Sequence, residues 1–341
     1  MVRLKDIARQ ANVSVMTVSK ALRDAPDVSD ETRARIKALA AQMGYVPDSS
    51  AQCLRGRTTR IFGLVIPSTT NPIYARIVFA IEDRAHELGY DLLLVHTLNM
   101  PEREEHGIRR LISRRVDGLF ISPVYRYEAE ARIYQEITAR NIPTVLLGPP
   151  APFCKNFVSM EIEELASSHA VTRHLLKLGH KRIAYLAGPP AAPWAHERFE
   201  GYRRALREEN LDVDDKLVFA AGGTIEDGAR ATLQMLNEKC NTTAVQAVND
   251  LVAVGCAETL LANGMAIPDD VSVAGFGNIM VAEHFRVPLT TVRQPKFRLG
   301  IAAVNTMMKL LRGEPAESQR QAAELIERKS TAAPKVKPVE R

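Results

Sequence analysis

The sequence predicts an all-α helix-turn-helix head followed by an α/β body of doubly wound parallel sheets. Three observations lead to this fold class. Residues 12–22 have the pattern of the second helix of a helix-turn-helix. All of the excess positive charge lies within the first 60 residues. From Ile61 onward, apolar runs suited to buried parallel strands alternate with stretches of helical periodicity.

Residues 12–22, NVSVMTVSKAL, read as a tight turn followed by a short helix. Asn12 tolerates the left-handed conformation that such a turn requires. The Ser14 hydroxyl can accept a hydrogen bond from the free backbone N–H groups of the first helical turn. Val18 and Leu22 are four residues apart and share an inward face. So short a helix needs packing partners, which are expected at Leu4–Gln10 and Ser29–Met43.

The charge distribution points to nucleic acid as the partner of the head. The chain has 341 residues and a formal net charge of +5. Residues 1–60 hold eleven basic and six acidic side chains, and the remainder holds 34 of each. A basic head on a neutral body is typical of a DNA-binding protein. The length exceeds one ordinary core, so more than one domain is expected.

Other classes of protein lack support in the sequence. No amino-terminal apolar run precedes a small-residue cleavage site, and no stretch approaches about 18 apolar residues. Nucleophile-elbow, phosphate-loop and zinc-protease motifs are missing, so no catalytic residue, cofactor or metal is expected. The cysteines are scattered and are expected to be reduced thiols of a cytoplasmic, nucleoid-associated protein: Cys53, Cys154, Cys240 and Cys256.

The segment 47–60 admits two interpretations. Ser49 or Ser50 can cap a short helix that runs to Arg55 and becomes stable only against DNA. Leu54 would then be an apolar wedge between base pairs. The other interpretation is a flexible basic linker. In either case the arginines of this segment are expected near phosphates: Arg55, Arg57 and Arg60.

The body divides into two series of alternating elements. The first series has strands expected at 61–67, 90–96, 118–122 and 143–148 and helices at 74–88, 102–114 and 127–140. A second series begins with a strand at 157–160. Its further strands are expected at 182–187, 217–220, 244–248 and 271–276, and its helices at 162–178, 196–209, 225–237 and 251–263. The chain then runs through 290–293 to a helix at 296–311, a last strand at 323–327 and a disordered tail at 334–341.

Several motifs occur in an order that identifies a family. The chain resembles the LacI/GalR family of bacterial transcriptional regulators over nearly its full length. The motifs are LKDIARQANVSVMTVSKAL, VSDETRARIKALAAQMGYVP, LRGRTTRIFGLVIP, RRVDGLFIS, LGHKRIAYLAGP, ERFEGYRRAL, IPDDVSVAGF and LTTVRQP.

This resemblance implies a repressor that binds a palindromic operator as a homodimer and holds a small sugar-like effector between two lobes. The body would be of the periplasmic-binding-protein type. The implied domains are a DNA-binding head at 1–46, a hinge at 47–60, an effector-binding and dimerisation body at 61–330 and a flexible tail at 331–341. Lobe one would comprise about 61–158 and 291–321, and lobe two about 159–290 and 322–330.

The resemblance also implies the residues that contact DNA. Val15, Met16 and Lys20 match the positions that read base edges, where Lys20 could donate to guanine or to a phosphate. Met16 could instead pack half-buried, and Lys20 could be a solvated charge. Candidate phosphate contacts are Thr17, Ser19 and Ser29. In the hinge, Leu54 matches the residue that intercalates at the operator centre.

For the effector, the resemblance implies residues from both lobes. The first-lobe candidates are Ser68, Ile73 and Tyr74, and the second-lobe candidates are Trp194, Arg198, Asn249, Asp250 and Asn278. Arg198 could bind hydroxyls or a carboxylate through its fork. Trp194 could stack on a sugar ring or serve as a hydrophobic lid. Asp250 could contact the effector or cap the helix that follows it.

Two departures from the family pattern bear on the ligand. Glycines, Gly148 and Gly277, stand where the family often has acids that would hold sugar hydroxyls. The ligand is therefore expected to be anionic, larger than a monosaccharide or bound differently, for example a gluconate or uronate. The rival functions are a sugar-binding transport protein and an α/β enzyme. A transport protein would carry a signal peptide and lack the basic head.

Overall fold

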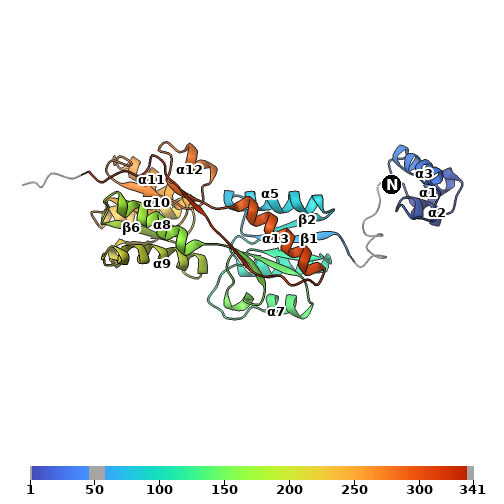
Figure 1. The fold of residues 1–341 in the computed structure, drawn as a ribbon, viewed down its shortest axis with the longest axis horizontal. Helices are drawn as coiled ribbons and strands as arrows, with labels where there is room; N and C mark the ends of the chain where they lie inside the picture. Colours follow the sequence, from blue (N-terminus) through green and yellow to red (C-terminus); the bar gives the residue numbers. More distant parts are fainter. Residues whose placement is uncertain (1, 46–57, 336–341) are drawn as a thin grey trace, which may run out of the picture. The chain divides into compact units, whose positions relative to one another are not determined.

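The computed structural model describes residues 2–45 and 58–335 and separates the chain into two compact units, 1–59 and 60–341. The helices described in the first unit are α1 (Leu4–Ala11), α2 (Val15–Ala21) and α3 (Asp30–Gln42) (Figure 1). They lie within one residue of the helices predicted from the sequence.

The three helices share a small core. Ile7 of α1, Val18 of α2 and Ile36 of α3 are completely buried against one another. Leu22 packs at the edge of this core. Asn12 ends α1 in the left-handed conformation, at φ 53° and ψ 47°. The turn therefore delivers α2 at a fixed angle to α1, which confirms the predicted helix-turn-helix.

The second unit begins with lobe one, a six-stranded parallel sheet in the order β11-β5-β4-β3-β1-β2. Its strands are β1 (Ile61–Ile66), β2 (Asp91–His96), β3 (Gly118–Ile121), β4 (Thr144–Leu147), β5 (Val158–Ile162) and β11 (Gln319–Gln321). Its helices are α5 (Pro72–Glu87), α6 (Pro101–Ser113), α7 (Arg132–Ala139) and α13 (Lys296–Leu311).

Strand β1 explains why helices cover both faces of this sheet. Phe62 and Leu64 pack in the cluster formed by α5 and α13. Val65, the residue after Leu64, packs in the cluster formed by α6 and α7. Successive side chains of a strand point to opposite faces, so an uninterrupted apolar run needs cover on both sides.

Lobe two has the same three-layer design. Its parallel sheet has the order β7-β6-β8-β9. The strands are β6 (Ile183–Ala187), β7 (Val218–Ala220), β8 (Ala244–Ala247) and β9 (Ser272–Ala274). Helices α8 (Glu164–Lys177) and α9 (Pro193–Glu208) pack together, as do α10 (Ile225–Asn237) and α11 (Asp250–Ala262). Figure 1 shows the two lobes joined by extended segments.

One of these crossings is a two-stranded antiparallel ribbon of β10 (Thr291–Arg293) and β12 (Glu324–Ile326). The strand order reverses between β1 and β3 in lobe one and between β6 and β8 in lobe two. Ligands of doubly wound sheets bind near the carboxyl ends of the strands at such a point. The fold therefore predicts a ligand site between the two lobes.

Several elements differ from the sequence prediction. Strand β5 joins the sheet of lobe one instead of opening the second series. Helix α7 begins at Arg132, not Tyr127, because the preceding segment bonds elsewhere: the Val124 N–H donates to Glu104. The polar edge strand β11 and the short α12 (Met280–His284) carry too little periodicity to be predicted.

The start of the predicted flexible tail, 331–335, is anchored to lobe two. The Ala332 carbonyl accepts hydrogen bonds from His180 Nε2 at 2.8 Å and from Ser272. Burial lowers the pKa of His180, so the ring is neutral and its Nδ1 accepts from Thr243. Lys335 forms an ion pair with Asp269. His180 therefore orders its loop.

Within 2–45 and 58–335, no helix combines the length and the apolar character needed to cross a membrane. The same residues contain no cluster of histidine, cysteine and acidic side chains suited to a metal ion. Three of the four cysteines lie in the described ranges, and all are unpaired thiols: Cys154, Cys240 and Cys256.

Candidate functional site

Helix α2 presents an exposed apolar tip. Its first two residues, Val15 and Met16, are 47% and 54% exposed, although both side chains are apolar. Val18, one turn further on, is completely buried. Met16 therefore does not pack in the core, and the exposed pair is available for apolar contact with a groove, such as with thymine methyl groups.

Lys20 is not simply a solvated charge. Its ammonium group forms an ion pair with Asp27 in the loop before α3. The hydrogen bond from Lys20 lowers the pKa of the Asp27 carboxyl. Both side chains are about half exposed, so the pair is weak and open to competition from another anion.

The hydroxyl groups of the head cap its helices. Ser14 Oγ accepts from the Thr17 N–H at 3.0 Å and lies 2.8 Å from the Thr17 hydroxyl. Ser29 Oγ accepts from the Thr32 N–H and donates to its hydroxyl at 2.9 Å. The Ser19 carbonyl accepts from Arg23. Thr17, Ser19 and Ser29 remain candidate phosphate contacts. Ser29 also caps α3.

Most of the predicted hinge lies outside the described residues, including Leu54, Arg55 and Arg57. Arg60 is described, and it is the first residue of the second unit. Its backbone N–H donates to Asp117, and its guanidinium donates to the Leu88 carbonyl and lies over the Tyr90 ring. These contacts hold the exposed Arg60 side chain against lobe one, and the phosphate contact at Arg60 stays a prediction.

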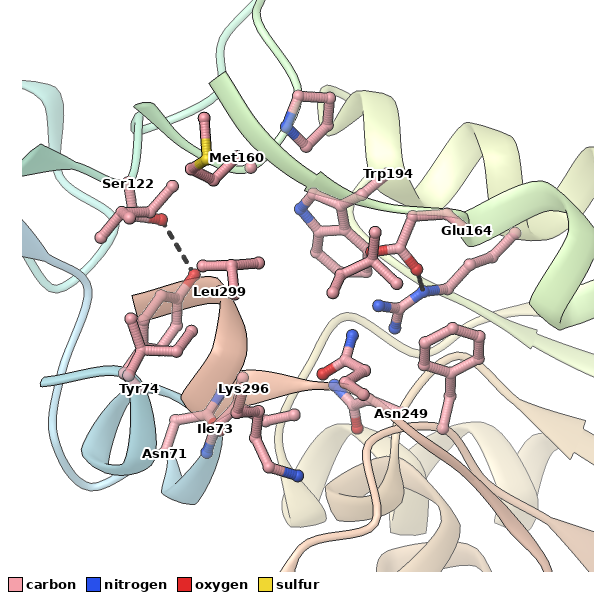
Figure 2. Close-up of a pocket in the computed structure, with 18 of the residues that line it drawn as sticks. Asn71, Ile73, Tyr74, Ser122, Met160, Glu164, Trp194, Asn249, Lys296 and Leu299 are labelled. Carbon is pink, nitrogen blue, oxygen red and sulfur yellow. Dashed lines mark hydrogen bonds and ion pairs between the residues drawn. The ribbon is translucent and has the colours of Figure 1, made fainter. Parts of the chain in front are cut away.

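A pocket lies between the two lobes, with about 800 Å³ of free space when its open part is included (Figure 2). Apolar side chains form much of its wall: Ile73, Ile77, Leu147, Met160, Ile162 and Leu299. Four aromatic rings contribute: Tyr74, Tyr125, Trp194 and Phe276. The polar side chains are Asn71, Ser122 and Gln294 with Glu164, Arg198, Asn249 and Lys296.

The lobe-one wall is held by two tyrosine hydroxyls. Tyr74 Oη lies 3.0 Å from Ser122 Oγ, a contact visible in Figure 2. Tyr125 Oη donates to the Pro149 carbonyl at 2.8 Å. Burial raises the pKa of both tyrosines, so both hydroxyls stay protonated. The two tyrosines therefore bring no charge to this wall.

The lobe-two wall is organised by Arg198. Its Nε donates to Glu164 at 2.7 Å and its Nη1 donates to the Val248 carbonyl at 2.6 Å. The guanidinium lies 3.6 Å from the centroid of Phe276 and 4.8 Å from that of Trp194. Burial raises the pKa of Glu164, and Arg198 opposes that shift. Arg198 is therefore fixed in place before any ligand arrives.

Lys296, at the start of α13, reaches from lobe one to lobe two. Its ammonium group donates to the carbonyls of Gly277 at 2.5 Å and Asn278 at 3.1 Å. Burial lowers the pKa of Lys296 to about 8, while the carboxylate of Asp250 opposes this effect. This lysine links the two lobes at the edge of the pocket.

Three predicted effector residues are not part of the pocket wall. Ser68 bonds to Thr70. Asp250 is buried, accepting from the Ile279 N–H and the Thr291 hydroxyl, so it orders the loop after β9. Asn278 accepts from Arg328. Asp250 also does not cap α11, because Asn249 accepts from the Val252 N–H there.

The other five predicted effector residues are brought together at the wall: Ile73, Tyr74, Trp194, Arg198 and Asn249. Sequence reasoning missed several polar neighbours. Ser122 follows β3 directly, and the carboxyl end of a parallel strand is a signal that could have identified it. Gln294 and Lys296 lie in and just after the LTTVRQP motif, but no local pattern marks them as pocket residues.

A helix-turn-helix with an exposed reading helix, together with a two-lobed α/β body around a polar and aromatic pocket, defines a ligand-responsive class of DNA-binding regulator. Two family models match the chain. Residues 3–48 match "Bacterial regulatory proteins, lacI family", and residues 172–331 match "Periplasmic binding protein-like domain".

Individual proteins resemble the chain along its length. The transcriptional regulator DegA of Bacillus subtilis (strain 168) is 30% identical, with 96% of this chain and 97% of DegA covered. The transcriptional repressor PurR of Histophilus somni (strain 129Pt) is 30% identical, with 97% and 99% covered. A lac repressor dimer bound to operator and the anti-inducer ONPF superimposes with a TM-score of 0.85 at 28% identity, covering 97% and 99%.

This chain belongs to the lacI family of bacterial regulatory proteins. It is a DNA-binding transcriptional regulator with an effector-binding body, and the predicted resemblance is confirmed. Its relatives are transcriptional regulators rather than transport proteins or enzymes.

Proposed function

We propose that the protein is a repressor that binds a two-fold symmetric operator as a homodimer and changes its operator affinity when a small molecule occupies the interlobe pocket. The observation that carries the proposal is a single pocket wall built from both lobes, with Tyr74 and Lys296 on one side and Trp194, Arg198 and Asn249 on the other. A ligand held by both walls stabilises one angle between the lobes over others.

The proposed reading surface is the exposed face of α2. Val15 and Met16 make apolar contacts with base edges, while Lys20 leaves Asp27 for a guanine or a phosphate. Thr17, Ser19 and Ser29 contact phosphates and set the register of the head on the duplex. In the hinge, Leu54 enters the minor groove at the operator centre, and Arg55 and Arg57 neutralise neighbouring phosphates.

The proposed domains follow the same division: a head at 1–46, a hinge at 47–60 and a body from 61 to 330. Each lobe of the body is continuous with the hinge or with the crossing segments, so a change in lobe angle alters the separation of two hinges in a dimer. The cost of ordering these hinges on DNA then changes, which couples the two sites. The sign depends on which lobe angle the effector favours.

Homodimerisation is proposed because one copy of α2 reads only a half-site, and the lac repressor noted above is a dimer on its operator. The candidate contact surfaces are α5 and α11. Exposed apolar side chains on lobe one and lobe two are also available for such an interface: Phe79, Leu94, Met280 and Val281.

The test is selection of binding sites from random duplex DNA with the full-length protein, followed by sedimentation of the complex. The expected result is a two-fold symmetric consensus bound by two chains. Several phosphate contacts per head would give a log–log salt slope of about −5 or steeper. An asymmetric site bound by one chain would contradict the proposal, as would a slope near zero.

A further inference from the structure

The charged groups around the pocket neutralise one another. Arg198 is paired with Glu164 at 2.7 Å. Lys296 donates to the carbonyls of Gly277 and Asn278, and the buried carboxylate of Asp250 acts on it electrostatically. These groups are two cations and two carboxylates, so their net charge is zero. Arg76 and Arg293 also act on Lys296, but both are exposed and screened by water.

An ionic ligand would bring an uncompensated charge into this balanced set. Moving a charge from water into a partly buried site is costly unless a free counter-charge meets it. Glu164 and Val248 use only two of the five N–H groups of Arg198, so Arg198 can still donate to a ligand. A ligand carboxylate would, however, lie beside Glu164 with no further cation to balance its charge. The charge balance therefore disfavours the sugar acids expected from the sequence.

Side chains of lobe one lie close to the two glycines that stand where the family often has acids. A Cβ at Gly148 would lie 3.0 Å from Tyr125 Oη. A Cβ at Gly277 would lie 2.9 Å from Ile73 Cδ1, and the glycine has φ +140°. The Tyr125 hydroxyl and the Ile73 methyl group therefore lie where acidic side chains would begin. At these positions a ligand meets a neutral hydroxyl and an apolar side chain in place of carboxylates.

Gln294 marks the polar end of the ligand. Its side chain is 7% exposed and belongs to the pocket wall, yet its Oε1 has no hydrogen-bond partner. A buried amide oxygen without a partner is costly, and such groups occur where a ligand supplies the missing contact. Rotation of the terminal amide is broad and two-fold, so either Oε1 or Nε2 can turn toward a ligand.

From the charge balance, the filled glycine positions and the unpartnered amide, we propose that the pocket binds an uncharged ligand. The ligand carries a ring with an apolar face and a hydroxyl or amide group that bonds to Gln294. This proposal rests on the proposed effector function and narrows the chemical class of the effector. Gln294 is the residue that determines specificity for the polar group.

The test compares neutral compounds with charged analogues of the same scaffold, using titration calorimetry on the full-length protein. The pairs are phenyl β-glucoside with phenyl β-glucuronide, glucose with glucuronate, and adenosine with adenosine monophosphate. At least one neutral compound is expected to bind, and more tightly than its charged partner by about tenfold or more. Binding of no neutral compound would overturn the proposal, as would tighter binding of any charged partner.

Two matched variants test the role of Gln294. Gln294→Met removes the amide at nearly constant side-chain volume and is expected to lower the affinity for the neutral ligand about tenfold. Gln321→Met removes a second amide whose Oε1 is also unpartnered but which is not part of the pocket wall, so binding should not change. Neither change removes an observed hydrogen bond of a side chain, so thermal unfolding midpoints should not fall. Unchanged ligand affinity in Gln294→Met would overturn the assignment.

Operator binding separates this proposal from the proposed function. A neutral compound that binds but leaves operator affinity unchanged contradicts the effector role and supports the ligand class. A charged compound that binds more tightly than its neutral analogue and changes operator affinity contradicts the ligand class and supports the effector role.

Discussion

Arg198 and Glu164 form a buried ion pair that joins α9 to α8, with Nε and Oε2 separated by 2.7 Å and both side chains more than nine-tenths buried. A buried pair adds little net stability compared with an apolar pair, but removal of one partner leaves the other uncompensated. Arg198→Met is therefore expected to lower the free energy of unfolding by about 3–5 kcal/mol. Urea denaturation of the full chain measures it.

The control for this prediction is an exposed pair of the same type. Arg204 and Glu208 are one helical turn apart on α9, and Arg204 is 63% exposed. Arg204→Met should change the free energy of unfolding by less than about 1 kcal/mol. The double variant Arg198→Met with Glu164→Met should regain much of the loss. Equal losses in the single and double variants would show that Glu164 is not the source of the penalty.

The ion pair between Lys20 and Asp27 is expected to compete with DNA. Asp27→Asn frees the ammonium group for a phosphate or a base, so affinity for duplex DNA at low salt should rise several-fold, and the salt slope should steepen by about one unit. Fluorescence anisotropy at a series of salt concentrations measures both. Glu31→Gln removes one negative charge from the same unit and serves as the control. Equal gains in both variants would mean that only net charge matters.

Substitutions on the exposed and the buried face of α2 should have different effects, the first on operator recognition and the second on the stability of the head. Val15→Ala and Met16→Ala alter exposed side chains, so they are expected to change operator preference in binding-site selection with little change in unfolding. Val18→Ala removes buried methyl groups and should destabilise the head by about 2 kcal/mol. Hydrogen exchange of the head measures this loss. A change of operator preference caused by Val18→Ala alone would contradict the assignment.

Leu54→Ala tests the proposed wedge in the hinge. If Leu54 enters the operator centre from each chain, its truncation should weaken operator binding about 10- to 100-fold and leave binding to random duplex unchanged. Competition assays with both DNAs give the ratio. Gln52→Ala, two residues away in the same segment, is the control. An equal loss on operator and random DNA would contradict intercalation.

The sequence predicted features that depend on neighbouring residues. Asn12 and Ser14 define the turn and cap of α2 through local backbone chemistry, and the apolar run from Ile61 identifies a two-sided buried strand. Contacts between segments that are distant in the sequence could not be predicted in this way. The pairing of Arg198 with Glu164 spans 34 residues, and the contact of Lys296 with Gly277 spans 19.

Such long-range contacts decide what the pocket can bind. Arg198 alone suggests an anionic ligand, whereas Arg198 with Glu164 does not. Family resemblance placed Asp250 and Asn278 among the effector residues, but their hydrogen bonds show that they order the loops behind the wall. Only the assembled fold distinguishes a side chain that faces the ligand from one that holds its neighbour.

Lys296 should make the stability of the body depend on pH in an unusual direction. Its pKa falls from the ordinary 10.5 to about 8, because burial disfavours the charged amine. Between these values the unfolded chain binds a proton that the folded chain lacks, so the contribution of Lys296 to stability rises as pH increases from about 8 to about 10.5. Below pH 8 both states are charged, and this contribution is constant.

The measurement is the difference in thermal unfolding midpoint between the wild-type protein and Lys296→Met at pH 7, 8, 9 and 10. Other titrating groups, including Cys154 with its pKa raised to about 11, are present in both proteins. Their contributions therefore cancel in the difference between the two midpoints. The wild-type midpoint minus the Lys296→Met midpoint should increase by a few degrees from pH 8 to pH 10. Lys309→Met, at an exposed position on the same helix, should show a much smaller change over this range. A constant difference at Lys296 would mean that water solvates its amine and that burial does not govern this link between the lobes.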